Sequence, residues 1–202
     1  MPPTEPILKQ ALKDDWELLA PVIQAHYSLA PFTNEEIRLE GKMHEVSHSR
    51  FAKLLIPFAR VVGALIPYHG SNVPVRVVNH SRSDRTGYFW QRTFFFPGSK
   101  PFQFPSTMLC TGDREITEYV RFGFGIRLKL SVRNGGLIES DHGYVVKVGR
   151  ATIPLPMNLL MGWASIQEMP VSESEFDMKM VLAHPLFGHM FAYNGRFALV
   201  RE

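Results

Sequence analysis

The segment from Tyr88 to Phe96 constrains the fold more than any other part of the chain. It reads Tyr-Phe-Trp-Gln-Arg-Thr-Phe-Phe-Phe. In an extended chain, successive side chains point to opposite faces of a sheet, so this run places aromatic rings on both faces. A sheet that is apolar on both sides is either covered by two layers or curled around an interior. We expect this strand to be central and covered on both faces, so Arg92, which shares a face with Trp90, needs a buried partner.

Alternating patterns predict a long series of further strands. We expect strands at about 34–48, 73–80, 86–96, 102–111, 115–122, 124–133, 136–148, 163–171, 174–182 and 190–200. The run Asn134-Gly135-Gly136 is a strong hairpin signal, because these residues tolerate a positive φ. The segments 111–114 and 194–195 are weaker turn signals. Sequential hairpins predict an antiparallel meander.

Helical patterns are concentrated before residue 70. The spacing of apolar residues predicts two or three short helices over 7–27. It also predicts a helix over 50–66, with Ser49 as N-cap and Pro57 kinking or dividing it. We therefore predict an α+β fold, with N-terminal helices packed on a large, strongly curved antiparallel sheet that resembles a half-open barrel. Residues 1–202 are expected to form one domain, with 1–70 a mainly helical cap containing one strand and 71–202 the meander.

Composition and charge exclude several classes of protein. Cys110 is the only cysteine, so the chain has no internal disulfide and no multi-cysteine zinc site. Residues 1–20 lack the basic start and apolar stretch of a secretory signal. The most apolar helical candidate, 54–67, contains Arg60 and is shorter than the ~20 residues of a membrane span. The net charge of +3 is spread thinly, which argues against nucleic-acid binding. We expect a cytoplasmic protein without a membrane span.

The segment 153–161 interrupts the strands. It contains Pro154, Pro156 and six large apolar residues, which suits a connector or a single helical turn lying across an opening. This segment is either a lid over a cavity or, more simply, a loop that plugs the end of the sheet with its own side chains.

The C-terminal part carries a resemblance to a known family. Residues 183–188 read Ala-His-Pro-Leu-Phe-Gly and residues 193–197 read Tyr-Asn-Gly-Arg-Phe. Together with matching features between Phe32 and Phe176, among them the tripeptide Trp90-Gln91-Arg92, they resemble the bacterial family catalogued as domain of unknown function 4166. The resemblance covers about 25–197. It implies a bacterial protein without established chemistry, found alone or attached to a dehydrogenase-like domain, and it supplies no catalytic residue. That domain is absent here, so we expect no cofactor.

Few titratable residues combine into a site. Glu168 lies between Ile166 and Met169 and could be a desolvated carboxylate that faces Arg92. A structural Arg92–Glu168 bridge is the favoured interpretation, and an acid–base role of Glu168 or His184 is the alternative. The spacing of the eight histidines does not predict a metal site.

Three functions are compatible with the sequence. The first is binding of an apolar or amphipathic small molecule in a curved-sheet cavity, with Trp90, Arg92, Glu168 and His184 as ligand-binding residues. The methionine-rich stripe of Phe176, Met178, Met180 and Leu182 fits both a soft ligand pocket and an ordinary core. The second function is an enzyme that uses Glu168 or His184 for proton transfer in the same cavity. The third is an accessory domain that docks on a dehydrogenase-like partner through an exposed apolar patch.

Overall fold

The computed structural model describes residues 4–63 and 65–200, and no side chain is described for residues 58 and 59. The helices are α1 (Ile7–Leu12), the 3₁₀ helix η1 (Lys13–Leu18), α2 (Pro21–His26), α3 (Ala52–Val62), the 3₁₀ helix η2 (Arg121–Gly123) and α4 (Asn158–Met161). The strands are β1 (Glu36–His48), β2 (Gly70–Arg82), β3 (Arg85–Phe94), β4 (Phe102–Gly112), β5 (Glu115–Tyr119), β6 (Phe124–Arg133), β7 (Gly136–Val148), β8 (Ala151–Leu155), β9 (Trp163–Pro170), β10 (Glu175–His184) and β11 (Gly188–Leu199).

The strands within the described residues close into a ten-stranded antiparallel barrel. The sheet order is β6-β5-β4-β3-β2-β1-β11-β10-β9-β7-β8, and an additional pairing of β6 with β7 joins its two ends. The first half of β7, Leu137–Ser140, pairs with β9, and its second half, Tyr144–Val148, pairs with β8 on the same edge. The other edge of β7 pairs with β6. The predicted half-open barrel is therefore wrong.

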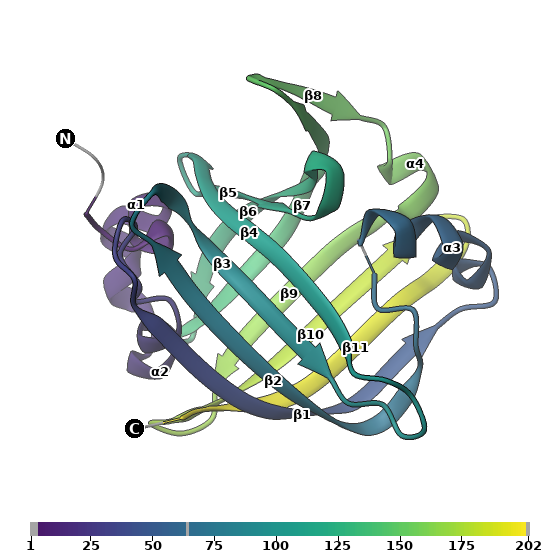
Figure 1. The fold of residues 1–202 in the computed structure, drawn as a ribbon, viewed down its shortest axis with the longest axis horizontal. Helices are drawn as coiled ribbons and strands as arrows, with labels where there is room; N and C mark the ends of the chain where they lie inside the picture. Colours follow the sequence, from purple (N-terminus) through teal and green to yellow (C-terminus); the bar gives the residue numbers. More distant parts are fainter. Residues whose placement is uncertain (1–3, 64, 201–202) are drawn as a thin grey trace.

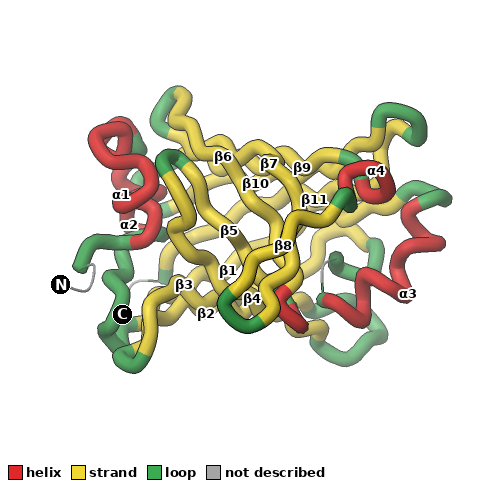
Figure 2. The backbone as a smooth tube through the Cα atoms, turned by 90° about the horizontal axis from the view of Figure 1, so that it is seen from above, coloured by secondary structure: helices red, strands yellow, loops and turns green. Residues whose placement is uncertain are grey.

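The helices occupy the two ends of the barrel. In Figure 1, α1 and α2 lie at one end, beside the C-terminus, whereas α3 and α4 lie at the other, and Figure 2 shows the same separation from above. Helix α2 and its neighbours bury Leu8, Leu12, Ile23 and Tyr27 against the strands. The prediction of short opening helices is confirmed. No helix among the residues described is both long and apolar enough to cross a lipid bilayer.

Strand β3 is covered on one face only. Tyr88, Trp90, Arg92 and Phe94 are buried inside the barrel, whereas Gln91 on the outer face is exposed. The outer ring of Phe89 stacks on His80 of the neighbouring strand, with ring centroids 5.4 Å apart, so a neighbouring side chain shields it. The expectation that both faces are covered by layers is wrong, because the sheet curls around the inner face.

The turns follow the sequence signals in part. Asn134 and Gly135 form the β6–β7 turn with φ of 51° and 76°, as predicted. The expected turn at Asn194-Gly195 is wrong, because both residues lie inside β11. Gly195 pairs with Met43 and Met178, and a Cβ atom there would lie 2.5 Å from the backbone oxygen of Lys42. This glycine thus allows a close approach of two strands.

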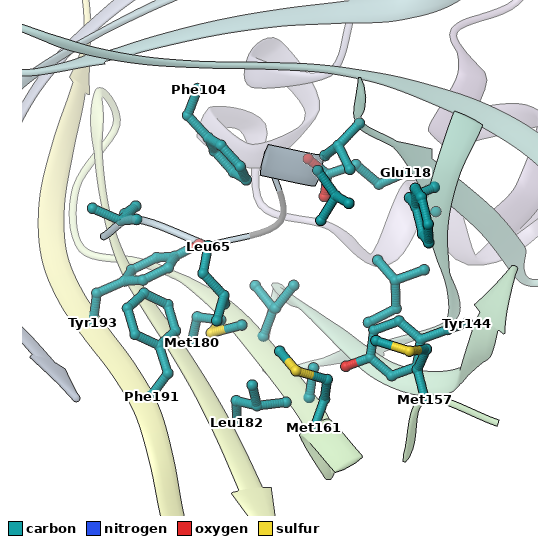
Figure 3. A pocket seen from close by; sticks show the side chains of 18 of the residues that line it. Leu65, Phe104, Glu118, Tyr144, Met157, Met161, Met180, Leu182, Phe191 and Tyr193 are labelled. Atoms are coloured by element: carbon teal, nitrogen blue, oxygen red, sulfur yellow. The ribbon is translucent and has the colours of Figure 1, made fainter. Parts of the chain in front are cut away.

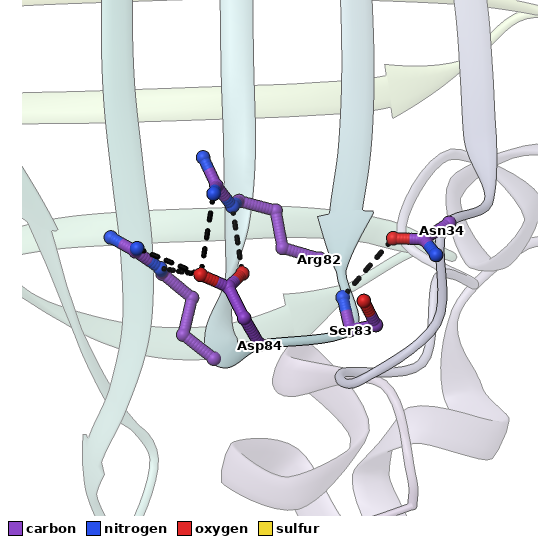
Figure 4. Close-up of polar contacts among 5 residues, drawn as sticks. Asn34, Arg82, Ser83 and Asp84 are labelled. Carbon is purple, nitrogen blue, oxygen red and sulfur yellow. Dashed lines mark hydrogen bonds and ion pairs between the residues drawn. The ribbon is translucent and has the colours of Figure 1, made fainter.

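The β2–β3 turn is held by charged and polar side chains (Figure 4). The Asp84 carboxylate accepts hydrogen bonds from Arg82, at 2.9 and 3.3 Å, and from Arg85, at 3.1 and 2.8 Å. The amide oxygen of Asn34 accepts from the backbone N–H of Ser83 at 3.2 Å. Hydrogen bonds from the two guanidinium groups lower the pKa of Asp84. The hydrogen bond from Ser83 to Asn34 ties the turn to the segment that precedes β1.

Helix α3 begins as predicted. The backbone N–H of Ala52 donates to the hydroxyl of Ser49 at 3.0 Å, so Ser49 is the N-cap. Pro57 lies inside α3, which continues from Ala52 to Val62 without being divided. The helix lies at the end of the barrel opposite α1 and α2 (Figure 1).

Candidate functional site

A cavity of about 110 Å³ lies inside the barrel, at the end that α3 and α4 occupy (Figure 3). Its wall is almost entirely apolar and comes from distant parts of the chain. Strands β10 and β11 contribute Met180, Leu182, Phe191 and Tyr193, and the segment after α3 contributes Leu65 and Ile66. The prediction that Met180 and Leu182 share one face is confirmed.

The segment 153–161 lies against this cavity. Ile153 belongs to the missed strand β8, which pairs with β7, and the predicted helical turn is α4. Met157 and Met161 line the cavity, whereas Leu159 points outward and is 77% exposed. The segment thus contributes to the wall of the cavity, and a role as a moving lid stays a prediction.

Arg92 and Glu118 form a buried ion pair at the inner end of this cavity. A guanidinium N–H of Arg92 donates to the Glu118 carboxylate and to the hydroxyl of Ser106, which in turn donates to Glu118 at 2.6 Å. The guanidinium also lies over the rings of Trp90, at 4.2 Å, and Phe104, at 4.7 Å. The predicted Arg92–Glu168 bridge is wrong, although the expectation that Arg92 is buried and paired is confirmed.

A second cavity of about 30 Å³ lies deeper in the barrel, and Glu168 lines it. The other side chains with polar groups that line this cavity are Trp90, Arg92, Tyr193 and His26. Nδ1 of His26 lies 3.4 Å from Oε2 of Glu168. Among the described residues, neither of these two atoms has a partner that meets hydrogen-bond geometry. A volume of this size holds a water molecule or two but no substrate, since one water needs at least ~10–15 Å³. Arg92 lines both cavities.

Burial and repulsion perturb other groups in the interior. Glu139 is 2% exposed, and its Oε1 has no hydrogen-bond partner among the described residues. Burial, together with the charges of Glu168 and Glu118, raises the pKa of Glu139 well above its ordinary value. Burial and the same Glu168 charge raise the pKa of Tyr27. The interior therefore favours neutral forms of these two side chains.

His184 lies outside both cavities. Its Nδ1 accepts hydrogen bonds from the backbone N–H groups of Leu186, at 3.1 Å, and Phe187, at 3.3 Å. With Nδ1 accepting, Nε2 carries the proton and donates to the backbone oxygen of Leu159 at 3.1 Å. His184 thus connects α4 to the β10–β11 turn. Trp90, Arg92 and Glu168 lie together, and His184 does not join them.

Sequence reasoning missed the carboxylate that pairs with Arg92. Glu118 faces the interior because it lies two residues from the fully buried Ile116 and pairs with the buried Met108 on β4. The alternation of residues within 115–119 places Glu118 on the same face as Ile116. It identifies Glu118 as the partner of Arg92 only when the strand register is known, because β4 lies between β3 and β5. His26 and Glu139 were also missed. No group of three or more possible metal ligands occurs among the described residues.

Comparison with known proteins identifies the family. A family model described as domain of unknown function (DUF4166) matches residues 19–197. The chain belongs to this family. The predicted resemblance, which this DUF4166 chain shows over about 25–197, is therefore confirmed.

Two further similarities extend over most of this DUF4166 chain. It is 27% identical over 195 residues to the uncharacterised protein YndH of Bacillus subtilis strain 168, a match that covers 91% of this chain and 92% of YndH. A crystal structure of Rv2717c from M. tuberculosis is similar with a TM-score of 0.44 and 10% identity, over 91% of this chain and 99% of that one.

Proposed function

We propose that the barrel binds an apolar or amphipathic small molecule in its larger cavity. The observation that carries the proposal is an apolar interior space of about 110 Å³, bounded at its inner end by the ion pair of Arg92 and Glu118. Ligand pockets are mainly apolar, with a few polar groups that fix orientation. An engineered apolar cavity of ~150 Å³ binds benzene, so a space of this order accepts a small ring or a short chain.

The test is a titration with an uncharged apolar probe. We expect 1-octanol to bind the wild-type protein in isothermal titration calorimetry. Ala164 is 4% exposed and lines the cavity, so Ala164→Leu fills part of the space and should weaken octanol binding by about tenfold, the value of losing roughly 1.4 kcal/mol.

Ala183→Leu is the matched control, because Ala183 is exposed on the neighbouring strand β10. It should leave octanol binding unchanged. Absence of octanol binding to the wild-type protein, or equal binding by both variants, would contradict the proposed use of the cavity.

The acid–base alternative has less support. Glu168 faces a space of only about 30 Å³, and His184 is engaged with three backbone groups outside both cavities. A substrate at Glu168 would have to displace the barrel core. For this reason we propose binding and not catalysis.

A second candidate function is docking on a partner protein. Large apolar side chains are exposed beside the cavity, among them Leu159 on α4, at 77%, and Leu186 in the β10–β11 turn, at 83%. Exposed apolar patches are typical of interaction sites. Native mass spectrometry of the protein purified from its host separates the two candidates. A retained small molecule favours the cavity, and a stable heteromer of the apo protein favours docking.

A further inference from the structure

Three cationic side chains line a surface pocket beside the larger cavity. The pocket has a volume of about 550 Å³, and its charged lining residues are Arg60 of α3, Lys100 of the β3–β4 connection and Arg121 of η2. All three residues are exposed. The aromatic residues Tyr68 and Phe102 complete much of the wall, and their rings pack edge to face with centroids 5.7 Å apart.

The positive charge in this pocket is not neutralised by the chain itself. None of the pocket's lining residues is acidic, and no ion pair of Arg60, Lys100 or Arg121 occurs among the described residues. The sequence has no Asp or Glu over 46–83 or over 85–112, the stretches that supply most of the pocket. Three like charges around one depression repel one another, and a bound anion would offset that repulsion.

Local backbone geometry holds Arg121 at the pocket. The aliphatic part of its side chain passes over Gly63, where an added Cβ atom would lie 3.3 Å from both Cγ and Cδ of Arg121. Gly63 also has a φ of 70°, a conformation that favours glycine. The guanidinium of Arg121 thus reaches the pocket from η2. Lys100 reaches the same pocket from the connection between β3 and β4.

The basic pocket and the apolar cavity share a wall. Phe104 lines both, and Val62 and Val120, which line the cavity, directly precede Gly63 and Arg121, which line the pocket. The two spaces therefore lie side by side, with Phe104 between them. Guanidinium groups match the planar, bidentate geometry of carboxylate and phosphate.

We propose that Arg60, Lys100 and Arg121 bind the anionic head of an amphipathic ligand, a carboxylate or a phosphate monoester, whose apolar tail enters the larger cavity. This inference rests on the proposed binding function and specifies the class of ligand. The head group remains at the surface, beside Phe104, and the tail points toward the inner ion pair of Arg92 and Glu118.

The test compares four probes with the same eight-carbon tail: octanoate, octyl phosphate, 1-octanol and octylammonium. At low ionic strength, we expect both anions to bind about fivefold more tightly than octanol, because three exposed cations each add a modest attraction to the anionic head. Octylammonium should bind more weakly than octanol. Added salt should reduce the preference for the anions, since it screens exposed charges, and should not weaken octanol binding.

Variants localise the effect. The combined variant Arg60→Gln, Lys100→Gln, Arg121→Gln should lose the preference for both anions and retain octanol binding. The control Arg133→Gln, Arg150→Gln, Lys179→Gln changes the net charge equally at exposed residues that do not line the pocket, and it should keep the preference.

Each outcome decides. Binding of octanol and both anions with equal affinity would overturn the head-group site and leave the cavity proposal standing. Failure of all four probes to bind would overturn both proposals. Loss of the preference in the control variant would show an effect of net charge and overturn the site. Preference for only one of the two anions would identify the head group and support it. The salt dependence of binding to the wild-type protein tests the site without any variant. A preference for the anions that does not fall with added salt would overturn the head-group site.

Discussion

At the residue scale, the barrel interior combines ionisable side chains that differ in how well they are partnered. Arg92 and Glu118 pair with each other and both contact the hydroxyl of Ser106, whereas the buried Nε of Arg92 has no hydrogen-bond partner among the described residues. The charges of Glu168 and Glu118 repel an ionised Glu139 and raise its pKa. The charge of Arg92 lowers the pKa of Glu139 and offsets part of this effect. A buried carboxyl without a hydrogen-bond partner is costly when it ionises. The protonation state of Glu139 should therefore affect the stability of the fold.

Replacement of Glu139 tests this interpretation. Because its pKa in the folded state is raised, the folded protein retains a proton that the unfolded chain loses above about pH 4.3. Stability contributed by this proton is complete below that pH and is lost as the pH rises toward the folded-state pKa. Glu139→Gln should therefore increase the free energy of unfolding at pH 7 by ~1–3 kcal/mol and change it little at pH 4.

The measurement is urea unfolding at several pH values. Glu173→Gln is the control, because Glu173 is exposed and forms no ion pair within the described part of the chain. It should change neither the stability nor its slope with pH. A Glu139→Gln protein that is less stable than the wild type at pH 7 would show that the ionised carboxylate is well accommodated.

Residue-scale prediction from sequence was correct for burial and wrong for partners. The alternation around Arg92 was sufficient to place the guanidinium on a buried face, and a buried guanidinium needs a counter-charge. Which carboxylate supplies it depends on the strand register. Glu118 and Arg92 are separated by β4, and Glu168 lies on β9, where it faces His26.

At the element scale, alternation and turn chemistry predicted most strands. Strand β8 was missed because Pro154 and Pro156 disfavour a strand assignment. Pro154 is nevertheless accommodated because β8 is the outermost strand of the sheet order. Asn194-Gly195 was misassigned because an Asn-Gly pair is the typical residue pair of a tight turn, whereas here glycine serves the contact between β11 and β1.

Gly195 provides the prediction at this scale. An added methyl group would lie 2.5 Å from the Lys42 oxygen and 2.9 Å from the Met43 Cα, and rigid backbone moves little to accommodate it. Gly195→Ala should lower the free energy of unfolding by ~1–3 kcal/mol, as overpacking does. Gly112→Ala, at an exposed site whose nearest neighbour would be 3.6 Å away, should have little effect in the same chemical denaturation assay. Equal stability of both variants would contradict the close approach of the strands.

At the scale of the whole molecule, closure of the barrel could not be predicted from sequence. The sequence pattern indicated a curved sheet. It did not show closure, because consecutive strands of a meander pair in the same way whether or not the first and last strands of the sheet also pair. Closure depends on β7, which pairs with β6 along one edge and divides its other edge between β9 and β8. Closure also explains what covers the apolar inner face of β3. That face packs against the side chains of the opposite strands inside the barrel.

Hydrogen exchange distinguishes a closed barrel from an open one. Residues 125–129 of β6 pair with β5 on one edge and, apart from Arg127, with β7 on the other, so both alternating sets of amides in this range should be protected to the same degree. Amides of β8, which pairs only with β7, should exchange at least about tenfold faster on average. Rapid exchange of every second amide within residues 125–129 would indicate a free edge, and hence an open sheet.

The layer of Arg92 and Tyr193 between the two cavities has a consequence for any occupant of the larger one. Each methylene transferred from water to an apolar space contributes ~0.8 kcal/mol. That increment can continue along a chain only until its end meets the charged guanidinium and its partner carboxylate. The proposed binding function therefore predicts an affinity that rises with tail length and stops rising at a length set by the ion pair of Arg92 and Glu118.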